Sequence, residues 1–536
     1  MKRNLYKNIR ATFLLFLLAW SFPCAPVNAR EVLNARDFFS FDELTTLYDE
    51  ENLSPTLENK LNYLLATPFV DNSQAGANTR QFSQSPPLGE FLRVVHWNIE
   101  RGLEYDAIEA AFDSEAHLNI FLDSERFPFD SEKRREILEQ AALLRSADVI
   151  VLNEVDWGMK RTGYRSIAAD LAARLKMNHA FGVQFVELSP VHLSNQPPPA
   201  NAGENEIAEL VKIDPARYKG LHGIAILSRF PLENVRLVPF KHQPYDWYKS
   251  EKKEISLLEK GRRKLSEQVF LQKTLREVRR GGRATLLAEI ADARFPSGRV
   301  TIAATHLENR TKPAQRVAQL AELLDTIKNI SHPVVVAGDM NTSTSDLTPT
   351  SIRREFMKRL GSPKFWIRSG ISYALGFGMI EDFIVTAADF GHTHADPTVR
   401  HIPFIAPNPE RKFFDALKNF RFADGGAFDF RGDRERSVGK KSRNLSNSNQ
   451  RGRKGFITTY RVNRPIMLVG KYKLDWIFVK PANLKNPFNR QESYRFAPHF
   501  GRTLTAVNQI VKDRISDHRP MLVDLPLGEP SLNKIK

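Results

Sequence analysis

Short apolar segments recur along this chain, and most of them end in a carboxylate, an amide or an imidazole. Residues 92–97 (LRVVHW) are followed by Asn98 and Glu100, and residues 149–152 (VIVL) run directly into Asn153 and Glu154. Further polar residues stand within or beside later apolar segments: His306, Asp339, Asn341, Asp475, Asp517 and His518. If these strands share one sheet edge, the polar side chains converge on a single pocket. Rigid scaffolds usually carry catalytic groups in this way.

Strand and helix patterns alternate between these segments. Residues 131–147 place Ile137, Ala141 and Leu144 on one helical face, with Asp130 or Ser131 as the N-cap. Residues 313–330 form a second amphipathic pattern, with a proline in the first turn. Other predicted strands cover 181–187, 224–227, 284–290, 300–305, 334–337, 474–479, 503–511 and 521–525. The sequence therefore predicts an α/β (α+β) fold in which helices cover β-sheets.

The first 29 residues are typical of a signal peptide. Four basic residues precede an apolar stretch at 11–20 (ATFLLFLLAW), and Val27-Asn28-Ala29 offers small residues for cleavage. The apolar stretch is shorter than the about 20 residues that span a bilayer. We therefore expect an exported protein, periplasmic or secreted, and an uncleaved N-terminal anchor is the alternative.

The single cysteine, Cys24, lies inside this N-terminal segment. Without cysteine, the remaining chain has neither disulfides nor thiolate metal ligands, so oxygen or imidazole must hold any metal. The chain has 78 basic and 62 acidic residues, and removing residues 1–29 leaves 74 basic residues and a net charge of +12. This charge suits a polyanionic partner such as nucleic acid or phospholipid headgroups. A basic exported protein without such a partner is the other interpretation.

The remaining sequence divides into a leader and linker at 30–90, a catalytic domain at 91–527 and a tail at 528–536. Two insertions interrupt the domain, at 245–280 and 343–470. The first is rich in Lys, Arg and Glu, and we expect a solvated segment. The second contains a Gly/Ser/Asn/Arg tract at 431–454, for which the composition predicts a mobile basic loop.

Six motifs in this order resemble the endonuclease/exonuclease/phosphatase superfamily. They are HWNIERG at 96–102, VLNEVD at 151–156, ATHLEN at 304–309, AGDMNT at 337–342, LDWIF at 474–478 and SDHRP at 516–520. GIAILSRFPL at 223–232 resembles a further strand motif of that superfamily. The resemblance spans about 92–526 and implies a four-layer sandwich of two packed mixed β-sheets flanked by helices. It also implies a metal-dependent hydrolase of P–O bonds.

The resemblance implies a metal site built from oxygen ligands. Glu154 corresponds to the principal metal carboxylate, Asn98 and Glu100 assist it, and Asp517 contacts the metal directly or through water. Mg²⁺ or Mn²⁺ is the implied cofactor, and the number of ions stays open. Mg²⁺ is typically bound by one or two carboxylates together with water and substrate phosphate.

The resemblance assigns the remaining motif residues to catalysis. Asp339 corresponds to the residue that orients or deprotonates the attacking water, and Asn341 fixes its geometry or contacts phosphate. His518 corresponds to the histidine that faces the phosphate, and Asp475 orients it. His306 resembles a second histidine that nucleases of the superfamily place against the phosphate or the leaving oxygen.

Some positions depart from the pattern or leave alternatives open. Glu100 stands where several nucleases have aspartate, and Ile224 stands where relatives often have asparagine. Lys160 and Arg161 follow Glu154 closely and are candidates for binding substrate phosphate. The alternative for them is a salt-linked turn with Asp156.

The motifs specify the chemistry more narrowly than the substrate. The basic charge, together with Phe456 and Tyr460 as stacking residues, favours a nuclease-like phosphodiesterase. A sphingomyelinase- or phospholipase-C-like enzyme is the alternative, and 371–380 (ISYALGFGMI) is its candidate docking loop. A phosphomonoesterase and a catalytically inactive binding module also stay open. We expect a monomer without an obligate protein partner.

Overall fold

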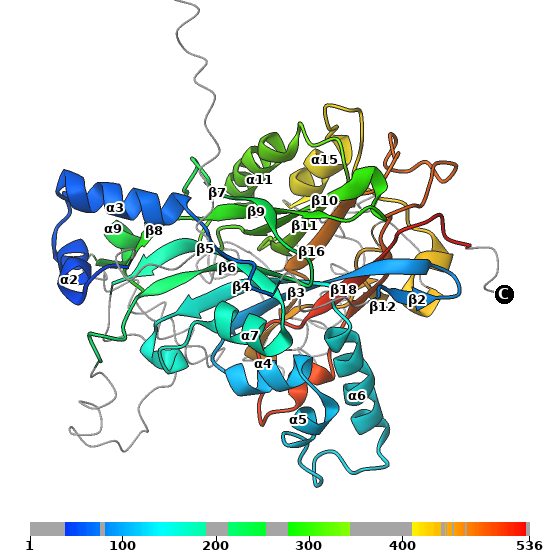
Figure 1. Cartoon of the computed structure of the whole chain (residues 1–536), viewed down its shortest axis with the longest axis horizontal. Coiled ribbons are helices and arrows are strands. Elements are labelled where there is room, and N and C mark those ends of the chain that lie inside the picture. Colours follow the sequence, from blue (N-terminus) through cyan, green and yellow to red (C-terminus); the bar gives the residue numbers. More distant parts are fainter. Residues whose placement is uncertain are drawn as a thin grey trace, which may run out of the picture.

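The computed structural model describes residues 38–74, 81–188, 213–252, 277–342, 410–440, 445, 447–452, 455–466 and 469–531. Two β-sheets form the centre of this part of the chain, and helices lie on their outer faces (Figure 1). Within the described residues, no helix combines the length and the apolar character that crossing a membrane requires.

The larger sheet contains nine of the described strands. Its main path is β1 (Phe69–Asp71), β5 (Asn178–Glu187), β6 (Leu221–Ser228), β4 (Val149–Trp157), β3 (Gly89–Arg101), β18 (Met521–Pro526) and β17 (His499–Thr503). β2 (Ser83–Ser85) also pairs with β3, and β8 (Arg279–Gly281) pairs with β5. β3 and β4 are parallel, and the other pairs are antiparallel.

The smaller sheet has five described strands. Their order is β16 (Asp475–Lys480), β11 (Val334–Asp339), β10 (Arg299–His306), β9 (Ala284–Ala291) and β7 (Glu233–Pro239). β10 and β11 are parallel, so their carboxyl ends lie side by side. Two short hairpins, β12 (Arg451–Gly452) with β13 (Gly455–Phe456) and β14 (Tyr460–Ile466) with β15 (Val469–Tyr472), lie outside both sheets.

Three hydrophobic cores separate four layers. One core joins Val94 and Val151 of the larger sheet to Ile302 and Ile477 of the smaller sheet. The second lies between the larger sheet and its helices. The third lies between the smaller sheet and its helices, where Phe414 stacks edge-on against Trp476. The expected four-layer sandwich is therefore confirmed.

The helices follow the capping and burial patterns of their sequences. Ser131 caps α6 by accepting a hydrogen bond from the backbone N–H of Arg134, as the sequence predicted. α6 and its neighbours cover the larger sheet, while α11 and α15 lie on the smaller sheet (Figure 1). The helices are α2 (Phe41–Asp49), α3 (Pro55–Ala66), α4 (Tyr105–Phe112), α5 (Glu115–Asn119), α6 (Glu132–Arg145), α7 (Ile167–Leu175), α9 (Trp247–Lys252), α11 (Pro313–Ile327) and α15 (Arg411–Asn419).

The segment before residue 91 contributes directly to the sandwich. α2 and α3 bury Leu44, Leu47 and Leu61 in the core of the larger sheet. β1 forms an edge strand on β5, and β2 forms a hairpin with β3. Residues 38–74 are therefore packed as part of the α/β unit.

Three predictions about individual segments are wrong. The described ends of the segment at 245–280, which was expected to be solvated, are packed, because Trp247, Tyr248 and Arg279 are buried. The strand predicted at 503–511 ends at Thr503, because Val507–Gln509 forms a 3₁₀ helix instead. The basic tract is packed where the structure describes its first residues, since Arg431 and Arg436 are at most 2% exposed. Both arginines contact Asp429, at 2.9 and 2.8 Å, and both lie over the ring of Tyr494. Ion pairing therefore holds these residues inside the fold. The segment at 371–380 lies outside the described residues.

Candidate active site

Irregularities in the pairing of β3 and β4 deliver the first group of site residues. The pairing of β3 with β4 shifts register between Asn98 and Arg101, and the pairing of β4 with β6 shifts between Asn153 and Val155. Glu100 and Glu154 adopt left-handed backbone conformations at these shifts, with φ of 48° and 52°. Bulges and left-handed non-glycine residues redirect side chains and are common at functional sites. They turn this sheet edge into a cluster of carboxylates.

The smaller sheet supplies a row of three residues at its edge. His306 on β10 is in register with Asp339 on β11, and Asp339 is in register with Asp475 on β16. All three side chains are buried. The backbone N–H of Asp339 donates to Asn153 Oδ1 at 2.7 Å, which links this row to the larger sheet.

Asn98 connects the two groups. Its side-chain amide donates to Glu154 Oε1 and to Asp339 Oδ2, both at 3.2 Å. Its side-chain oxygen, Oδ1, accepts a hydrogen bond from the backbone N–H of Glu100 at 3.1 Å. Asn98 is fully buried, so these bonds satisfy a side chain that would be costly to bury alone. The convergence expected from the strand ends is therefore present.

Asp475 holds two imidazoles. Its Oδ2 lies 2.7 Å from Nδ1 of His518, and its Oδ1 lies 3.0 Å from Nε2 of His96. Burial disfavours a charged imidazole, yet the carboxylates of Asp475 and Asp339 raise the pKa of His518 well above its ordinary value. Although burial opposes ionisation, His518 and His96 hold the pKa of Asp475 well below its ordinary value. His518 is therefore a cation oriented by a fixed anion.

Asp339 lies at the centre of the site. Its Oδ2 is 3.6 Å from Nε2 of His518 and 3.6 Å from Nε2 of His306. Its Oδ1 accepts the backbone N–H of Asn341 at 2.8 Å. Burial raises the pKa of Asp339 to about 7, although the charge of His518 lowers it in part. A carboxylate with a pKa near neutrality can exchange a proton with water at physiological pH.

Three carboxylates gather beside Asn98. Asp517 donates its backbone N–H to Glu100 Oε2 at 2.8 Å, and Glu154 accepts from the side-chain amide of Asn98 at 3.2 Å. Burial and the charge of Asp517 raise the pKa of Glu100 to about 8, and burial also raises the pKa of Asp517. Close, buried carboxylates repel one another, and a divalent cation relieves this repulsion. The carboxylates of Glu154, Glu100 and Asp517 therefore offer oxygen donors of the kind that Mg²⁺ or Mn²⁺ prefers, and Asn98 adds a side-chain oxygen that here accepts the N–H of Glu100.

A second set of possible ligands is less suitable. Single ligand atoms of Asp339, Asp475 and His518 lie within 4.8 Å of one another. However, Asp475 and His518 already bind each other at 2.7 Å, and His96 takes the second oxygen of Asp475. A metal at this position would compete with these contacts for the oxygens of Asp475.

His306, Asn341 and Lys160 occupy different surroundings. Burial and the charge of Arg283 hold the pKa of His306 well below its ordinary value, so this imidazole is neutral. Asn341 donates its side-chain amide to the carbonyl of Leu307 at 2.9 Å, which fixes the turn after β11. Lys160 begins the short helix Lys160–Thr162, and its side chain is half-buried.

Arg161 does not belong to the substrate pocket. Its Nε and Nη2 contact Asp156, at 2.5 and 2.9 Å, and its Nη1 and Nη2 contact Glu187, at 3.0 and 2.8 Å. Only 2% of its side chain is exposed. The salt-linked alternative therefore holds for Arg161, and its assignment as a phosphate ligand is corrected. Its donors are occupied by two buried carboxylates.

Some site residues escaped sequence reasoning. His96, which binds Asp475, resembles any histidine inside a buried strand, and only its position two residues before Asn98 hints at a role. Asn153 is adjacent to Glu154, but its bond to the backbone of Asp339 needs the second sheet. Ser516 accepts from the backbone N–H of His518 and donates to the carbonyl of Asn98, at 3.1 and 2.7 Å. The SDH motif contained this serine without indicating its contacts.

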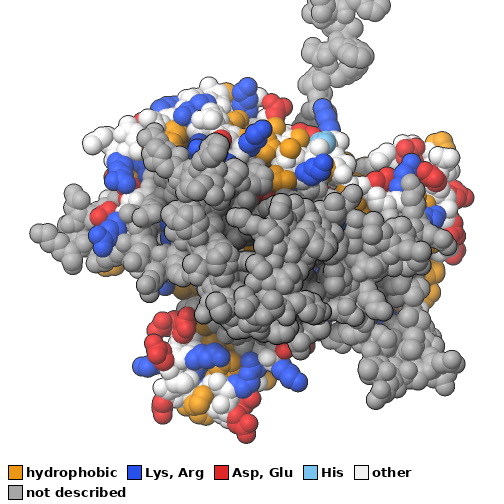
Figure 2. All heavy atoms as spheres, turned by 180° about the vertical axis from the view of Figure 1, so that it is seen from behind, with side chains coloured by type: hydrophobic (Ala, Val, Ile, Leu, Met, Phe, Trp, Pro, Cys, Tyr) orange, Lys and Arg blue, Asp and Glu red, His pale blue; other side chains and the backbone are white. Residues whose placement is uncertain are grey.

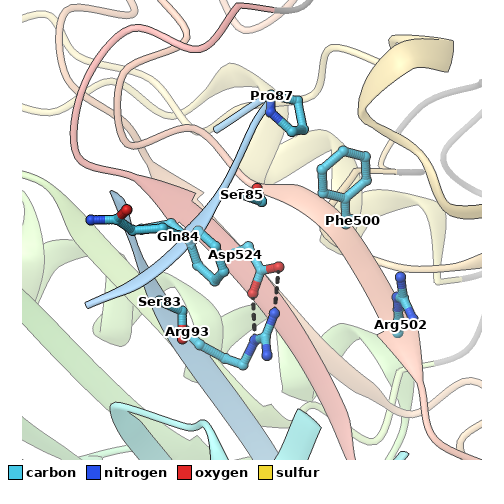
Figure 3. A pocket seen from close by; sticks show the side chains of 9 residues that line it. Ser83, Gln84, Ser85, Pro87, Arg93, Phe500, Arg502 and Asp524 are labelled. Carbon is cyan, nitrogen blue, oxygen red and sulfur yellow. Dashed lines mark hydrogen bonds and ion pairs between the residues drawn. The ribbon is translucent and has the colours of Figure 1, made fainter. Parts of the chain in front are cut away.

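A separate pocket of about 500 Å³ lies at the other end of β3 (Figure 3). Arg93 and Asp524 form a two-pronged ion pair in its wall, at 2.7 and 2.9 Å, and Phe500 and Arg502 lie nearby. Arg93 precedes Asn98 by five residues, about 16 Å along an extended strand. This pocket is therefore distinct from the carboxylate cluster.

Comparison with known proteins identifies one protein family and several solved structures that are similar to this chain. The family described as "Endonuclease/Exonuclease/phosphatase family" matches residues 95–518. Among solved structures, an endonuclease/exonuclease/phosphatase from Beutenbergia cavernae is 17% identical, with 82% of this chain and 72% of that chain covered and a TM-score of 0.35. The catalytic domain of human Nocturnin with bound sulfate is 15% identical, with coverages of 83% and 96% and a TM-score of 0.34. A 3'-5' exonuclease from Neisseria meningitidis is 14% identical, with coverages of 81% and 99% and a TM-score of 0.34. A search of curated proteins found no match.

Proposed function

This chain belongs to the endonuclease/exonuclease/phosphatase family, and we propose that it is an exported, divalent-metal-dependent phosphodiesterase of the nuclease-like type. One observation carries the proposal. Two sheets bring Asn98, Glu154 and Asp339 into one hydrogen-bonded group, with the buried pair of His518 and Asp475 beside it. In the proposed hydrolysis, a cation offsets the charge of the phosphate, a base takes a proton from water, and a donor binds the phosphate. These residues would hold the cation and supply the base and the donor.

Glu154, Asn98, Glu100 and Asp517 would hold Mg²⁺ or Mn²⁺. When bound, the ion offsets the negative charge that develops on the phosphate oxygens. The protein's part is to keep Glu154 ionised and the four side chains in place. Although burial favours the protonated form, the charges of Arg101 and His518 lower the pKa of Glu154, so its carboxylate is charged. Asn98 then holds that carboxylate in position through its amide.

Asp339 is the proposed general base. Its Oδ1 is fixed by the backbone N–H of Asn341, and its Oδ2 is fixed by Asn98. This leaves the carboxylate in one orientation, ready to take a proton from the attacking water. Positioned acid–base groups of this kind typically contribute about 10²–10⁴-fold to the rate.

His518 is the proposed donor to the phosphate. Its Nδ1 is held by Asp475, so its Nε2 carries the proton that faces the centre of the site. A charged imidazole donates to a non-bridging phosphate oxygen and becomes a stronger partner as negative charge builds there. Neutral His306, on the other side of Asp339, is placed to contact the phosphate or the leaving oxygen.

An aromatic side chain supports the nuclease-like assignment. The ring of Tyr460 lies 4.9 Å from that of His518 and stacks with Tyr472 at 6.0 Å. An aromatic face beside the catalytic histidine suits the stacking of a nucleobase. Phe456, by contrast, is only 4% exposed and packs against Trp476, so it contributes to the core.

Hydrolysis by the purified chain tests this function. Bis(p-nitrophenyl) phosphate, single-stranded and supercoiled DNA, RNA and sphingomyelin vesicles are compared with Mg²⁺ or Mn²⁺, with EDTA and Asp339→Ala as controls. We expect metal-dependent cleavage of the diester and of nucleic acid that Asp339→Ala abolishes. If the chain hydrolyses none of these substrates, the proposal is refuted. Export is tested by N-terminal sequencing of the protein from the extracytoplasmic fraction, where we expect a start at Arg30.

A lipid phosphodiesterase is the second candidate, and one surface feature favours it. Ile120 is 78% exposed and Phe129 is 73% exposed, and both lie in the segment that connects α5 to α6. These helices project from the sandwich, and the projection shows apolar atoms among basic and acidic ones (Figure 2). Exposed apolar residues beside cations are typical of membrane-docking loops. Cleavage of sphingomyelin that exceeds cleavage of DNA, and that falls in Ile120→Ser, would select this candidate.

A further inference from the structure

Three arginines surround the edge of the active site without belonging to its motifs. Arg101 follows Glu100 on β3 and is in register with Val155, the neighbour of Glu154. Arg279 lies on β8, in register with Glu187. Arg283 directly precedes β9, whose Thr285 pairs with Thr305 beside His306. All three therefore lie near the strand ends that carry the catalytic groups.

The three guanidinium groups share partners. The carboxylate of Glu277 contacts both Arg101 and Arg279. Arg279 and Arg283 both lie over the ring of Phe185, with their Cζ atoms 5.0 and 5.2 Å from its centroid. Arg283 also lies 3.4 Å from Glu308, whose carboxylate already accepts the indole N–H of Trp247. The three cations thus share the carboxylates of Glu277 and Glu308.

Each arginine has one buried N–H group whose hydrogen bond no described residue accepts. These donors are Nε of Arg101, Nε of Arg279 and Nη1 of Arg283. The side chains are 15%, 5% and 3% exposed. An unsatisfied buried donor costs about 1–3 kcal/mol, and more when the group is charged, so native proteins rarely leave several together. Arg161 in the same region shows the contrast, because its Nε, Nη1 and Nη2 all donate to carboxylates.

The electrostatic surroundings of these arginines favour the binding of an anion. Burial lowers the pKa of Arg279 to about 9, and Arg101 and Arg283 add to this shift against the opposing charge of Glu187. Arg283 likewise helps to lower the pKa of neighbouring His306. The cations therefore repel one another and their surroundings, and an added anion would remove this repulsion.

We propose that Arg101, Arg279 and Arg283 bind a second phosphate group of the substrate, next to the phosphate that is hydrolysed. The inference rests on the proposed phosphodiesterase function and narrows its substrate to molecules that carry two phosphates close together. Phosphate is the anion that fits, because its oxygens accept several N–H donors at once and guanidinium groups match its geometry. The position beside Glu154 and His306 places this group on the same substrate molecule.

Isothermal titration calorimetry on the full chain tests the inference. With excess Mg²⁺, the probes are adenosine 5'-monophosphate and adenosine 3',5'-bisphosphate, which differ by one phosphate. We expect the wild-type chain to bind the bisphosphate at least about tenfold more tightly, equal to 1.4 kcal/mol. Arg279→Gln and Arg283→Gln should each reduce this ratio toward one. Arg236→Gln, an exposed arginine on β7, is the control and should keep the ratio.

The two proposals fail in different ways. Equal affinities in the wild-type chain, or binding of neither probe, would overturn the second-phosphate subsite. An unchanged ratio in a folded Arg279→Gln or Arg283→Gln chain, checked by circular dichroism, would also overturn it. The hydrolysis of bis(p-nitrophenyl) phosphate by the wild-type chain reports separately on the phosphodiesterase, since that substrate has one phosphate.

Discussion

Replacing Arg161 by glutamine decides whether this residue supports the fold or binds substrate. In the wild-type structure its guanidinium group contacts Asp156 and Glu187 through four bonds of 2.5–3.0 Å. The carboxylates of Asp156 and Glu187 are 0% and 2% exposed. Glutamine cannot neutralise them. Asp156 keeps only a contact of 2.8 Å with His222, whose pKa is lowered by burial, and Glu187 keeps the more distant charge of Arg279.

The expected loss of stability follows from this geometry. Removing one partner of a buried ion pair typically costs about 3–5 kcal/mol, because a buried charge is left without compensation. Two carboxylates lose their partner here, so we expect the upper part of this range. Such a loss is a large fraction of the about 5–15 kcal/mol that stabilises a typical domain.

Urea denaturation followed by tryptophan fluorescence measures the effect. Arg165→Gln is the matched control, because its side chain is 45% exposed and its contact with Asp106 is 3.4 Å long. We expect that control to change the free energy of unfolding by less than about 1 kcal/mol. If Arg161→Gln keeps wild-type stability and instead raises KM for a phosphodiester, our structural assignment is refuted and Arg161 binds phosphate.

Three other outcomes test the site and the packed basic tract. Asp475→Asn should lower kcat by about 10²–10⁴-fold with little change in KM, because His518 loses the anion that orients and charges it. Steady-state kinetics with Mg²⁺ measure kcat and KM, and an unchanged kcat would contradict the prediction. The profile of kcat/KM against pH should rise to a plateau through about pH 7, because Asp339, with a pKa raised to about 7, must be ionised to act as base; a flat profile between pH 5 and 9 would exclude this role. Two arginines hold the pKa of Asp429 below its ordinary value against the effect of burial, so its stabilisation is present above about pH 4 and lost as pH falls. Urea unfolding should show Asp429→Asn less stable at pH 7, with the difference narrowing below pH 4, and a difference independent of pH would contradict the ion pairing.

Local patterns in the sequence predicted the elements that local physics determines. The apolar strands at 149–152 and 334–337 and the helix capped by Ser131 lie where their residue types place them. The prediction failed at 503–511, where apolar residues alternate but the chain turns into a 3₁₀ helix. It also failed at Arg431 and Arg436, because a polar tract looks solvated until Asp429 and Tyr494 are known to surround it.

The site also contains residues that a single motif identifies and contacts between residues far apart in the sequence, which no motif identifies. The family motifs identify residues whose roles follow from their own position, such as Asn98 and Glu154 at the ends of strands. Contacts between the sheets are not visible in any motif. His96 is more than 370 positions away from Asp475, which it binds. The three partly unpaired arginines come from separate strands and loops, and no single segment reveals that they meet.

The arrangement of the two sheets explains why the active site depends on the core between them. Glu154 and its carboxylate neighbours belong to the larger sheet or to the loop before β18, whereas Asp339 and Asp475 belong to the smaller sheet. Asn98 bridges the two groups with bonds of 3.2 Å to each. A small slip of one sheet over the other would therefore separate the proposed metal ligands from the proposed base. The close packing of Val94, Val151, Ile302 and Ile477 opposes that slip. In this fold the hydrophobic core between the sheets fixes the distance on which the proposed hydrolysis depends.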